Sequence, residues 1–143
     1  MSSYKVLSFK GAELPAQYVA MVFSKWLRSQ RYGNDLLKLV DSDSYYATYK
    51  ILIGNILMQP SCVVRIAVLS DDHDVALGFS VCRDKIIDYV HVHKDYRRQG
   101  IATSLLSHVP QDGEGWTTSA ITKTFNIFWP HKVFQKMIFN PFI

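Results

Sequence analysis

The sequence predicts a single α/β (α+β) domain whose mixed, mostly antiparallel central sheet is flanked by helices. Apolar residues recur at helical spacing up to residue 57, and three β-branched runs joined by short turns follow between residues 62 and 93. At residue 100 a strand-like run gives way, through a glycine, to a new apolar helix face. The chain has 143 residues and 48% hydrophobic content, which suits one core, so we expect one domain over residues 1–143.

The first part of the chain predicts one strand and two helices. Residues 4–9 alternate loosely and predict the strand, and Pro15 suits the first turn of a helix that residues 32–35 interrupt. The apolar stripe of this helix comprises Tyr18, Val19, Val22, Phe23, Trp26 and Leu27. Residues 41–44 are good N-cap residues for a second helix that ends near Pro60. The side chains that this helix is expected to bury are Tyr45, Tyr49, Leu52, Ile53, Ile56 and Leu57.

The middle of the chain predicts an antiparallel meander of three strands. Apolar and β-branched residues fill residues 62–69, 75–82 and 85–93, and the connections between them are short and polar. Gly78 lies inside the second of these strands, where a glycine indicates a bulge or the close approach of another backbone.

The last third of the chain predicts a helix, a strand, a second helix and a closing strand. The first helix is expected from residue 100 to about residue 108, and the strand at residues 116–120. The aromatic-rich residues 125–134 are expected to be helical, and residues 136–139 to form the last strand.

The junction between the strand at residues 86–92 and the following helix carries the main functional signal. It reads Arg97-Arg98-Gln99-Gly100-Ile101-Ala102. Two cations, small residues and the first N–H groups of a helix meet there, and the adjacent arginines are unfavourable at a helix start unless an anion is present. The junction therefore predicts a pyrophosphate site, and the alternative is an ordinary strand-to-helix turn with two solvated arginines.

The pattern Arg97-x-x-Gly100-x-Ala102 resembles the acetyl-CoA loop of the GCN5-related N-acetyltransferases (GNAT), which reads Arg/Gln-x-x-Gly-x-Gly/Ala after the fourth strand. The preceding Val90-His91-Val92 is similar to the strand segment that pairs with pantetheine in that family. The resemblance implies the acyl-CoA N-acyltransferase fold, whose fourth and fifth strands splay apart to admit the pantetheine arm. It also implies acetyl-CoA as co-substrate, with the binding residues Val90, His91, Val92, Arg97, Arg98, Gln99, Gly100, Ile101, Ala102 and Thr103.

The implied reaction moves an acetyl group from acetyl-CoA to a primary amine, which requires a base for the amine proton. Asp88 and His91 are the predicted catalytic residues, and His93 is a third candidate base. Alternation along a strand would place Asp88 on one face and the two histidines on the other. A base from the loop at residues 32–35, acting through water, is a further alternative.

The resemblance also places Trp129 at the position where the family has a tyrosine that protonates the departing CoA thiolate. An indole N–H is not a useful acid near neutral pH, so His131 and Tyr96 are alternative donors. Because tryptophan replaces the family tyrosine, a second interpretation stays open, in which a GNAT-like module binds CoA or a protein partner with little or no turnover.

Composition and charge indicate which classes of binding partner to expect. The net charge of +4 and the pI near 9.1 favour an anionic ligand such as the CoA nucleotide. The basic residues are dispersed, which argues against a nucleic-acid groove, although charge alone would suggest one. No apolar run reaches the roughly 20 residues of a membrane span.

Cysteine usage and the first residues predict the compartment. Cys62 and Cys82 form no Cys-x-x-Cys pair, and residues 1–5 lack the pattern of a secretory signal, so we expect reduced thiols in a cytoplasmic protein. His91-x-His93 has no further ligands at metal-binding spacing, so we expect no metal. The acceptor is an unidentified amine on a small molecule or protein, and the apolar residues 139–143 leave a homodimer open.

Overall fold

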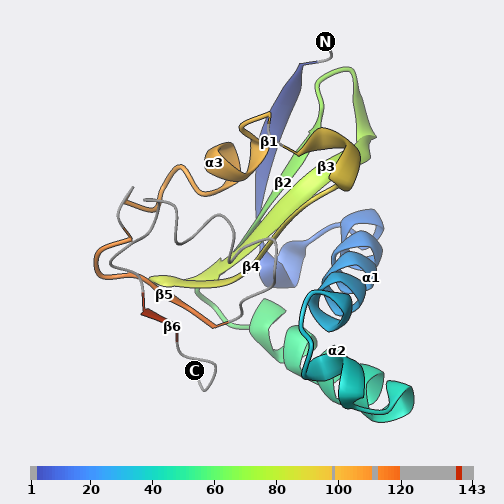
Figure 1. Ribbon diagram of the computed structural model, residues 1–143. Helices are drawn as coiled ribbons and strands as arrows, with labels where there is room; N and C mark the ends of the chain where they lie inside the picture. The colour runs from blue at the N-terminus through green and yellow to red at the C-terminus, as the bar shows by residue number, and fades with distance from the viewer. Residues whose placement is uncertain (1–2, 98, 111–112, 120–137, 140–143) are drawn as a thin grey trace.

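The computed structural model describes residues 3–97, 99–110, 113–119 and 138–139, and only the backbone of the last two. The described strands form one six-stranded sheet in the order β1-β2-β3-β4-β5-β6. Helices α1 and α2 pack on one face of this sheet and the short α3 packs on the other (Figure 1). The main elements are β1 (Tyr4–Lys10), α1 (Ala16–Tyr32), α2 (Ser42–Leu57), β2 (Cys62–Leu69), β3 (Asp72–Arg83), β4 (Ile86–Val92), α3 (Ile101–Leu105), β5 (Thr117–Thr118) and β6 (Ile138–Phe139).

The sheet combines antiparallel and parallel pairing. Strands β1 to β4 are antiparallel neighbours, whereas β5 runs parallel to β4 and β6 runs parallel to β5. This mixed, mostly antiparallel sheet with helices on both faces confirms the predicted fold class. Strand β3 begins at Asp72, three residues earlier than predicted, because the polar residues that read as a turn continue the hairpin with β2.

The ends of α1 and α2 follow from local chemistry. Pro15 is the N-cap of α1 rather than a residue of its first turn, and in either place its missing N–H has no helical partner to lose. The helix ends at Gly33, whose N–H donates to the Ser29 carbonyl oxygen at 2.8 Å. Asp41 is the N-cap of α2, and its carboxylate accepts a bond from the N–H of Ser44 at 3.0 Å.

Two apolar clusters hold the sheet between the helices. On one face, Trp26 of α1 and Tyr45 of α2 pack with side chains of β2, β3 and β4. On the other face, Ile101 and Leu105 of α3 pack with Leu77 of β3 and neighbouring side chains. Strand β4 therefore lies under both clusters, which fixes its position in the domain.

Both cysteines belong to the buried part of the chain. Cys62 and Cys82 are free and buried, as the sequence predicted for packed thiols. Burial raises the pKa of Cys62 to about 11 and that of Cys82 to about 12, so both thiols stay protonated at neutral pH.

Two helices differ from the prediction. Leu52 of α2, expected to be buried, is 48% exposed, while its neighbour Ile53 is buried. Most residues between 51 and 57 are apolar, so periodicity alone cannot choose the buried face of this helix. Helix α3 spans only Ile101–Leu105 instead of reaching residue 108, because Leu106 leaves helical geometry at φ −108° and ψ 20°.

Gly11 passes so close to the end of α2 that no side chain fits there. A Cβ at Gly11 would overlap the carbonyl oxygen of Leu57 and would lie 2.9 Å from the Cys62 Sγ. We therefore expect Gly11→Ala to lower the free energy of unfolding by about 2–3 kcal/mol, measured by urea denaturation.

Gly54 on α2 provides the matched control. A Cβ at Gly54 would meet nothing nearer than the Phe23 ring at 4.0 Å. Since alanine is a better helix former than glycine by about 1 kcal/mol, Gly54→Ala should keep or raise the stability. Equal losses of stability for the two variants would contradict this account of Gly11.

Candidate functional site

The candidate site lies at a β-bulge in β4. Ile87 pairs with Cys82 and Tyr89 pairs with Val81, so Asp88 is an extra residue in β4, a β-bulge. After the bulge, the N–H of His93 donates to the Leu77 carbonyl of β3 at 2.8 Å. Because backbone groups alternate in direction along an antiparallel strand, those of residues 90 and 92 point away from β3, toward the side where β5 begins.

Strand β5 leaves this edge of β4 open within the described residues. Its pairing with β4 is confined to Ile86 and Ile87, and directly after β5 the Ser119 N–H donates to the Ile87 carbonyl at 3.0 Å. No described residue of β5 pairs with Val90 or Val92. Within the described residues, this edge therefore offers N–H and C=O groups to an extended ligand.

Asp88 lies inside the sheet rather than at a solvent-exposed site. Its carboxylate is fully buried and accepts bonds from Arg83 Nε at 2.6 Å and Arg83 Nη2 at 2.8 Å. The Ser119 hydroxyl donates a third bond, at 2.6 Å. The hydrogen bond to Asp88 raises the pKa of Arg83 further above its ordinary value, so the guanidinium stays charged. This environment favours a structural role for Asp88 over the predicted role of a base, and the bulge breaks the regular alternation on which the predicted faces rested.

His91 belongs to an aromatic row under α1. Its ring lies 5.8 Å from Phe79, and the neighbouring Tyr89 stacks on Trp26 with ring centroids 5.1 Å apart. Burial, with the positive charges of Arg97 and Lys25, lowers the pKa of His91 to about 4. The imidazole is therefore uncharged at neutral pH, and it holds a proton only weakly.

The other two candidates on this segment have local partners. The Nδ1 atom of His93 accepts a bond from the Asp95 N–H at 3.3 Å and caps the short 3-10 turn Lys94–Tyr96. Tyr96 packs against the apolar cluster under α3. Neither residue points to a clear role in proton transfer.

In the loop after β4, the structure gives a reason for the glycine beside the predicted approach of a ligand. Gly100 has φ +79°, in the left-handed region, and a Cβ there would meet nothing within 4 Å. The backbone conformation, not the available space, therefore requires glycine. Arg97 is exposed and its Nε donates to the Val92 carbonyl at 3.0 Å, while the Ile101 side chain is buried. With only five residues, α3 contributes less helix dipole than predicted.

Comparisons with known proteins identify the fold. No protein-family model and no curated protein matches the sequence. A solved structure named "Putative acetyl transferase from Pyrococcus furiosus" superposes with a TM-score of 0.59 at 16% sequence identity, covering 74% of this chain and 71% of that chain. This chain has the acetyltransferase fold. The fold is the one that the resemblance to the GCN5-related N-acetyltransferases implied.

Two further structures align over a similar share of the acetyltransferase fold. YjaB from Escherichia coli gives a TM-score of 0.49 at 20% identity, over 74% of this chain and 63% of that chain. A structure named "putative gnat family acetyltransferase" from Staphylococcus aureus also gives 0.49, at 18% identity, over 72% of this chain and 85% of that chain.

Three predicted site residues, Arg98, Trp129 and His131, lie outside the described residues. Two residues that the sequence did not single out, Arg83 and Ser119, meet Asp88 in the fold. No sequence signal could have found Ser119, because it lies 31 residues from Asp88 and only the parallel pairing of β5 brings it there.

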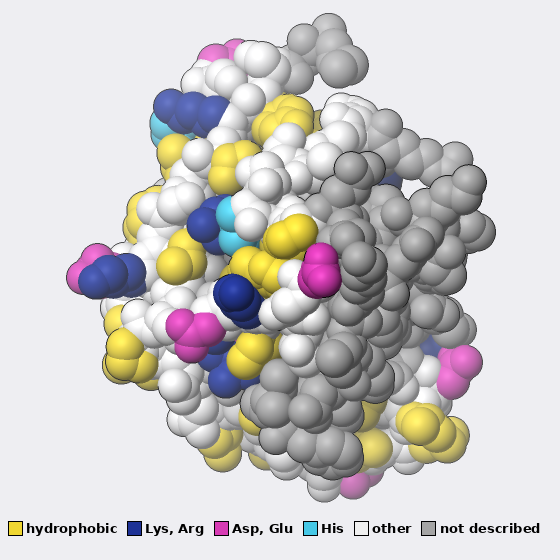
Figure 2. Space-filling view, turned by 90° about the vertical axis from the view of Figure 1, so that its left-hand side faces the viewer, with side chains coloured by type: hydrophobic (Ala, Val, Ile, Leu, Met, Phe, Trp, Pro, Cys, Tyr) yellow, Lys and Arg dark blue, Asp and Glu magenta, His cyan; other side chains and the backbone are white. Residues whose placement is uncertain are grey.

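The described residues also bear on the predicted partners: nucleic acid, metal and membrane. On the face in Figure 2, Lys and Arg side chains stand apart from one another rather than forming one patch. No three His, Cys, Asp or Glu side chains of residues 3–97, 99–110 and 113–119 come together as metal ligands. None of the described helices combines the length and apolar character of a membrane span.

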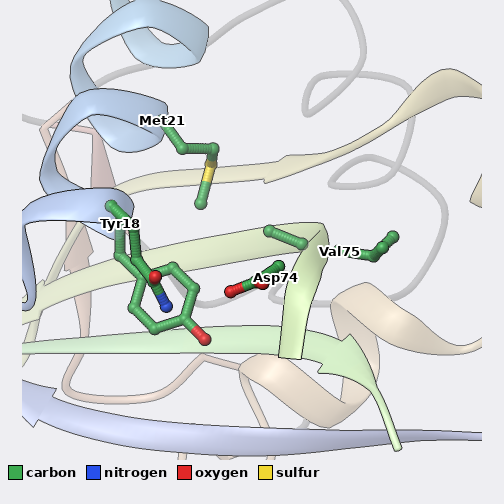
Figure 3. Close-up of a pocket in the computed structure, with 6 residues that line it drawn as sticks. Tyr18, Met21, Asp74 and Val75 are labelled. Carbon is green, nitrogen blue, oxygen red and sulfur yellow. The ribbon is translucent and has the colours of Figure 1, made fainter. Parts of the chain in front are cut away.

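An open hollow of about 590 Å³ lies between the start of α1 and the start of β3. In Figure 3, Tyr18 and Met21 extend from α1 toward Asp74 and Val75 of β3. The Tyr18 hydroxyl donates to the His73 carbonyl at 2.7 Å, which ties the two walls together. The hollow arises from the packing of distant segments, so no sequence pattern indicated it.

The lowered pKa of His91 predicts a loss of stability in acid. In the unfolded chain His91 takes up a proton near pH 6.5, whereas in the fold it does so only near pH 4. Stability should therefore fall as the pH drops through this window, by roughly 2–3 kcal/mol, and His91→Gln should reduce that fall.

Urea midpoints at pH 7.0, 5.5 and 4.5 measure this effect. His108 keeps part of the acid sensitivity in the variant, because burial and Arg65 lower its pKa too. An identical fall for wild type and His91→Gln would contradict the assignment to His91.

Proposed function

We propose that this chain is an N-acetyltransferase that moves the acetyl group of acetyl-CoA to a primary amine of a small molecule or protein. The observation that carries the proposal is the open edge of β4 after its bulge, directly followed by the Arg97–Thr103 loop, in a chain with the acetyltransferase fold. The Pyrococcus furiosus structure of the same fold carries the name "Putative acetyl transferase", which supports the same reaction class.

The edge of β4 suits the pantetheine arm. Pantetheine carries amide groups, and an extended ligand with amides can add to an open strand edge as another strand would. The backbone groups of Val90 and Val92 point toward that edge, and the Val92 carbonyl already accepts one bond from Arg97. The loop side chains Arg97, Gln99 and Thr103 are exposed, so with Arg98 and the first N–H groups of α3 they would hold the pyrophosphate.

The transfer needs an uncharged amine to attack the thioester carbonyl, after which the thiolate of CoA leaves and takes a proton. Backbone N–H groups at the open edge would polarise the carbonyl. His91 is better placed than Asp88 to accept a proton, since Asp88 is buried and already accepts three bonds. With a pKa of about 4, however, His91 assists only weakly, and the fraction of uncharged amine in solution should govern the rate.

A second candidate is a module that binds CoA, or a protein partner, with little turnover. The observation in its favour is that neither predicted base is strong, because Asp88 is tied to Arg83 and the pKa of His91 is about 4. In both cases we place the protein in the cytoplasm, where Cys62 and Cys82 would stay reduced.

CoA binding tests both candidates. We expect the wild type to bind CoA in calorimetry, and Ala102→Glu, in the first turn of α3, to weaken binding at least about tenfold by repelling the phosphates. Ser107→Glu, just beyond α3, is the matched control and should bind like the wild type. No binding by the wild type at millimolar CoA, or equal binding by Ala102→Glu, would contradict the proposed site.

The pH dependence of turnover separates enzyme from binder. We expect thiol release from acetyl-CoA to require added amine and to rise between about pH 6 and pH 8.5 as the amine loses its proton. His91→Gln should not move this rise, because the pKa of His91 lies below the range. A shifted rise in the variant would instead make His91 the titrating base. A screen of peptides, polyamines and aminoglycosides that yields no thiol, while CoA binds, would favour the binding module.

A further inference from the structure

We propose that Asp88 is a positioning residue: through Arg83 and Ser119 it holds the bulge that turns the backbone of β4 toward the open edge. The inference rests on the proposed function, since it assigns to that edge the binding of CoA. Asp88 itself touches neither the amine nor the thioester in this account. It acts through the shape of β4.

The carboxylate of Asp88 joins three strands at the point where the pairing changes. Arg83 at the end of β3 donates two bonds to it, at 2.6 and 2.8 Å, and Ser119 after β5 donates one at 2.6 Å. Asp88 is also the extra residue of the bulge. A bulge leaves its extra residue without a partner in the ladder, so other contacts must hold it in place.

Ser119 bonds to β4 both before the bulge and at the bulge itself. Its N–H donates to the Ile87 carbonyl, before the bulge, and its hydroxyl donates to the Asp88 side chain at the bulge. The Thr118 hydroxyl also donates to the Ile87 carbonyl, at 3.1 Å. These bonds fix Ser119 against β4 at the end of the described β5 segment, and thereby the position of the Val90 and Val92 backbone relative to a ligand at the open edge.

The buried charge of Asp88 at the bulge bears on the role of this residue. A carboxylate with no exposed surface loses its hydration, and an apolar side chain of similar size would fill the same space without that loss. What an apolar side chain cannot do is direct bonds to Arg83 and Ser119 at once. The charge therefore serves the geometry of the bulge more than the stability of the core.

The test compares Ser119→Ala, which removes one bond, with Ser119→Thr, which keeps the hydroxyl. Ser8→Ala, an exposed serine on β1 at the other edge of the sheet, is the matched control. We expect Ser119→Ala to weaken CoA binding about tenfold in calorimetry while its thermal unfolding stays cooperative, because a small misplacement of the edge is costly. Ser119→Thr should restore most of the affinity, and Ser8→Ala should bind like the wild type.

A second readout concerns the protein without CoA. The amide NMR signals of Val90 and Val92 should shift in Ser119→Ala and stay in place in Ser8→Ala. Unchanged amide signals together with unchanged CoA affinity in folded Ser119→Ala would overturn the proposal. If the wild type binds no CoA, the proposed function fails, and the amide signals alone still decide whether Ser119 and Asp88 position β4.

Asp88→Asn provides the stronger perturbation. It removes the charge that pairs with Arg83, so a folded Asp88→Asn should lose more CoA affinity than Ser119→Ala. Equal affinity for folded Asp88→Asn and the wild type would overturn the positioning role. Should this variant fail to fold, Ser119→Ala decides the question, because it removes a hydroxyl and leaves the ion pair.

Discussion

The ion pair between Arg83 and Asp88 holds the one place where the central strand departs from regular pairing. Strand β4 lies between the cluster under α1 and the cluster under α3, so neither face can move without disturbing a core. Only its edge toward β5 is open within the described residues. The fold thus provides a strand that is packed on both faces and has one open backbone edge, and the buried charge pair lies at the bulge where the direction of its peptide groups changes.

The sequence predicted the elements and the loop because both depend on local chemistry. Helical spacing located α1 and α2, β-branched runs located β2 to β4, and the small residues after β4 located the turn into α3. The bulge was not predictable, because Asp88 in an apolar strand also fits regular alternation. Its partners come from the end of β3 and from β5, so the interaction exists only once these strands have paired. Gly78 did predict close backbone approach, since a Cβ there would lie 2.5 Å from the His91 carbonyl oxygen.

Residue type alone does not describe the chemistry of the candidate bases. A histidine ordinarily titrates near neutral pH, yet His91 sits among aromatic rings with two cations nearby, and both effects disfavour its charged form. An aspartate is ordinarily a surface acceptor, yet Asp88 is enclosed. In this protein the surroundings of each group, rather than its identity, decide what proton chemistry it can support.

The two packed cysteines have a practical consequence. Their thiols are buried and protonated at neutral pH, so alkylating reagents, which attack the thiolate, find no reactive group on the folded protein. Cys62 and Cys82 lie on the neighbouring strands β2 and β3, and a reagent reaches them only when the packing over these strands opens. The rate of thiol modification therefore reports the opening of the core, and a cysteine introduced on the surface would carry a single label without interference from the native pair.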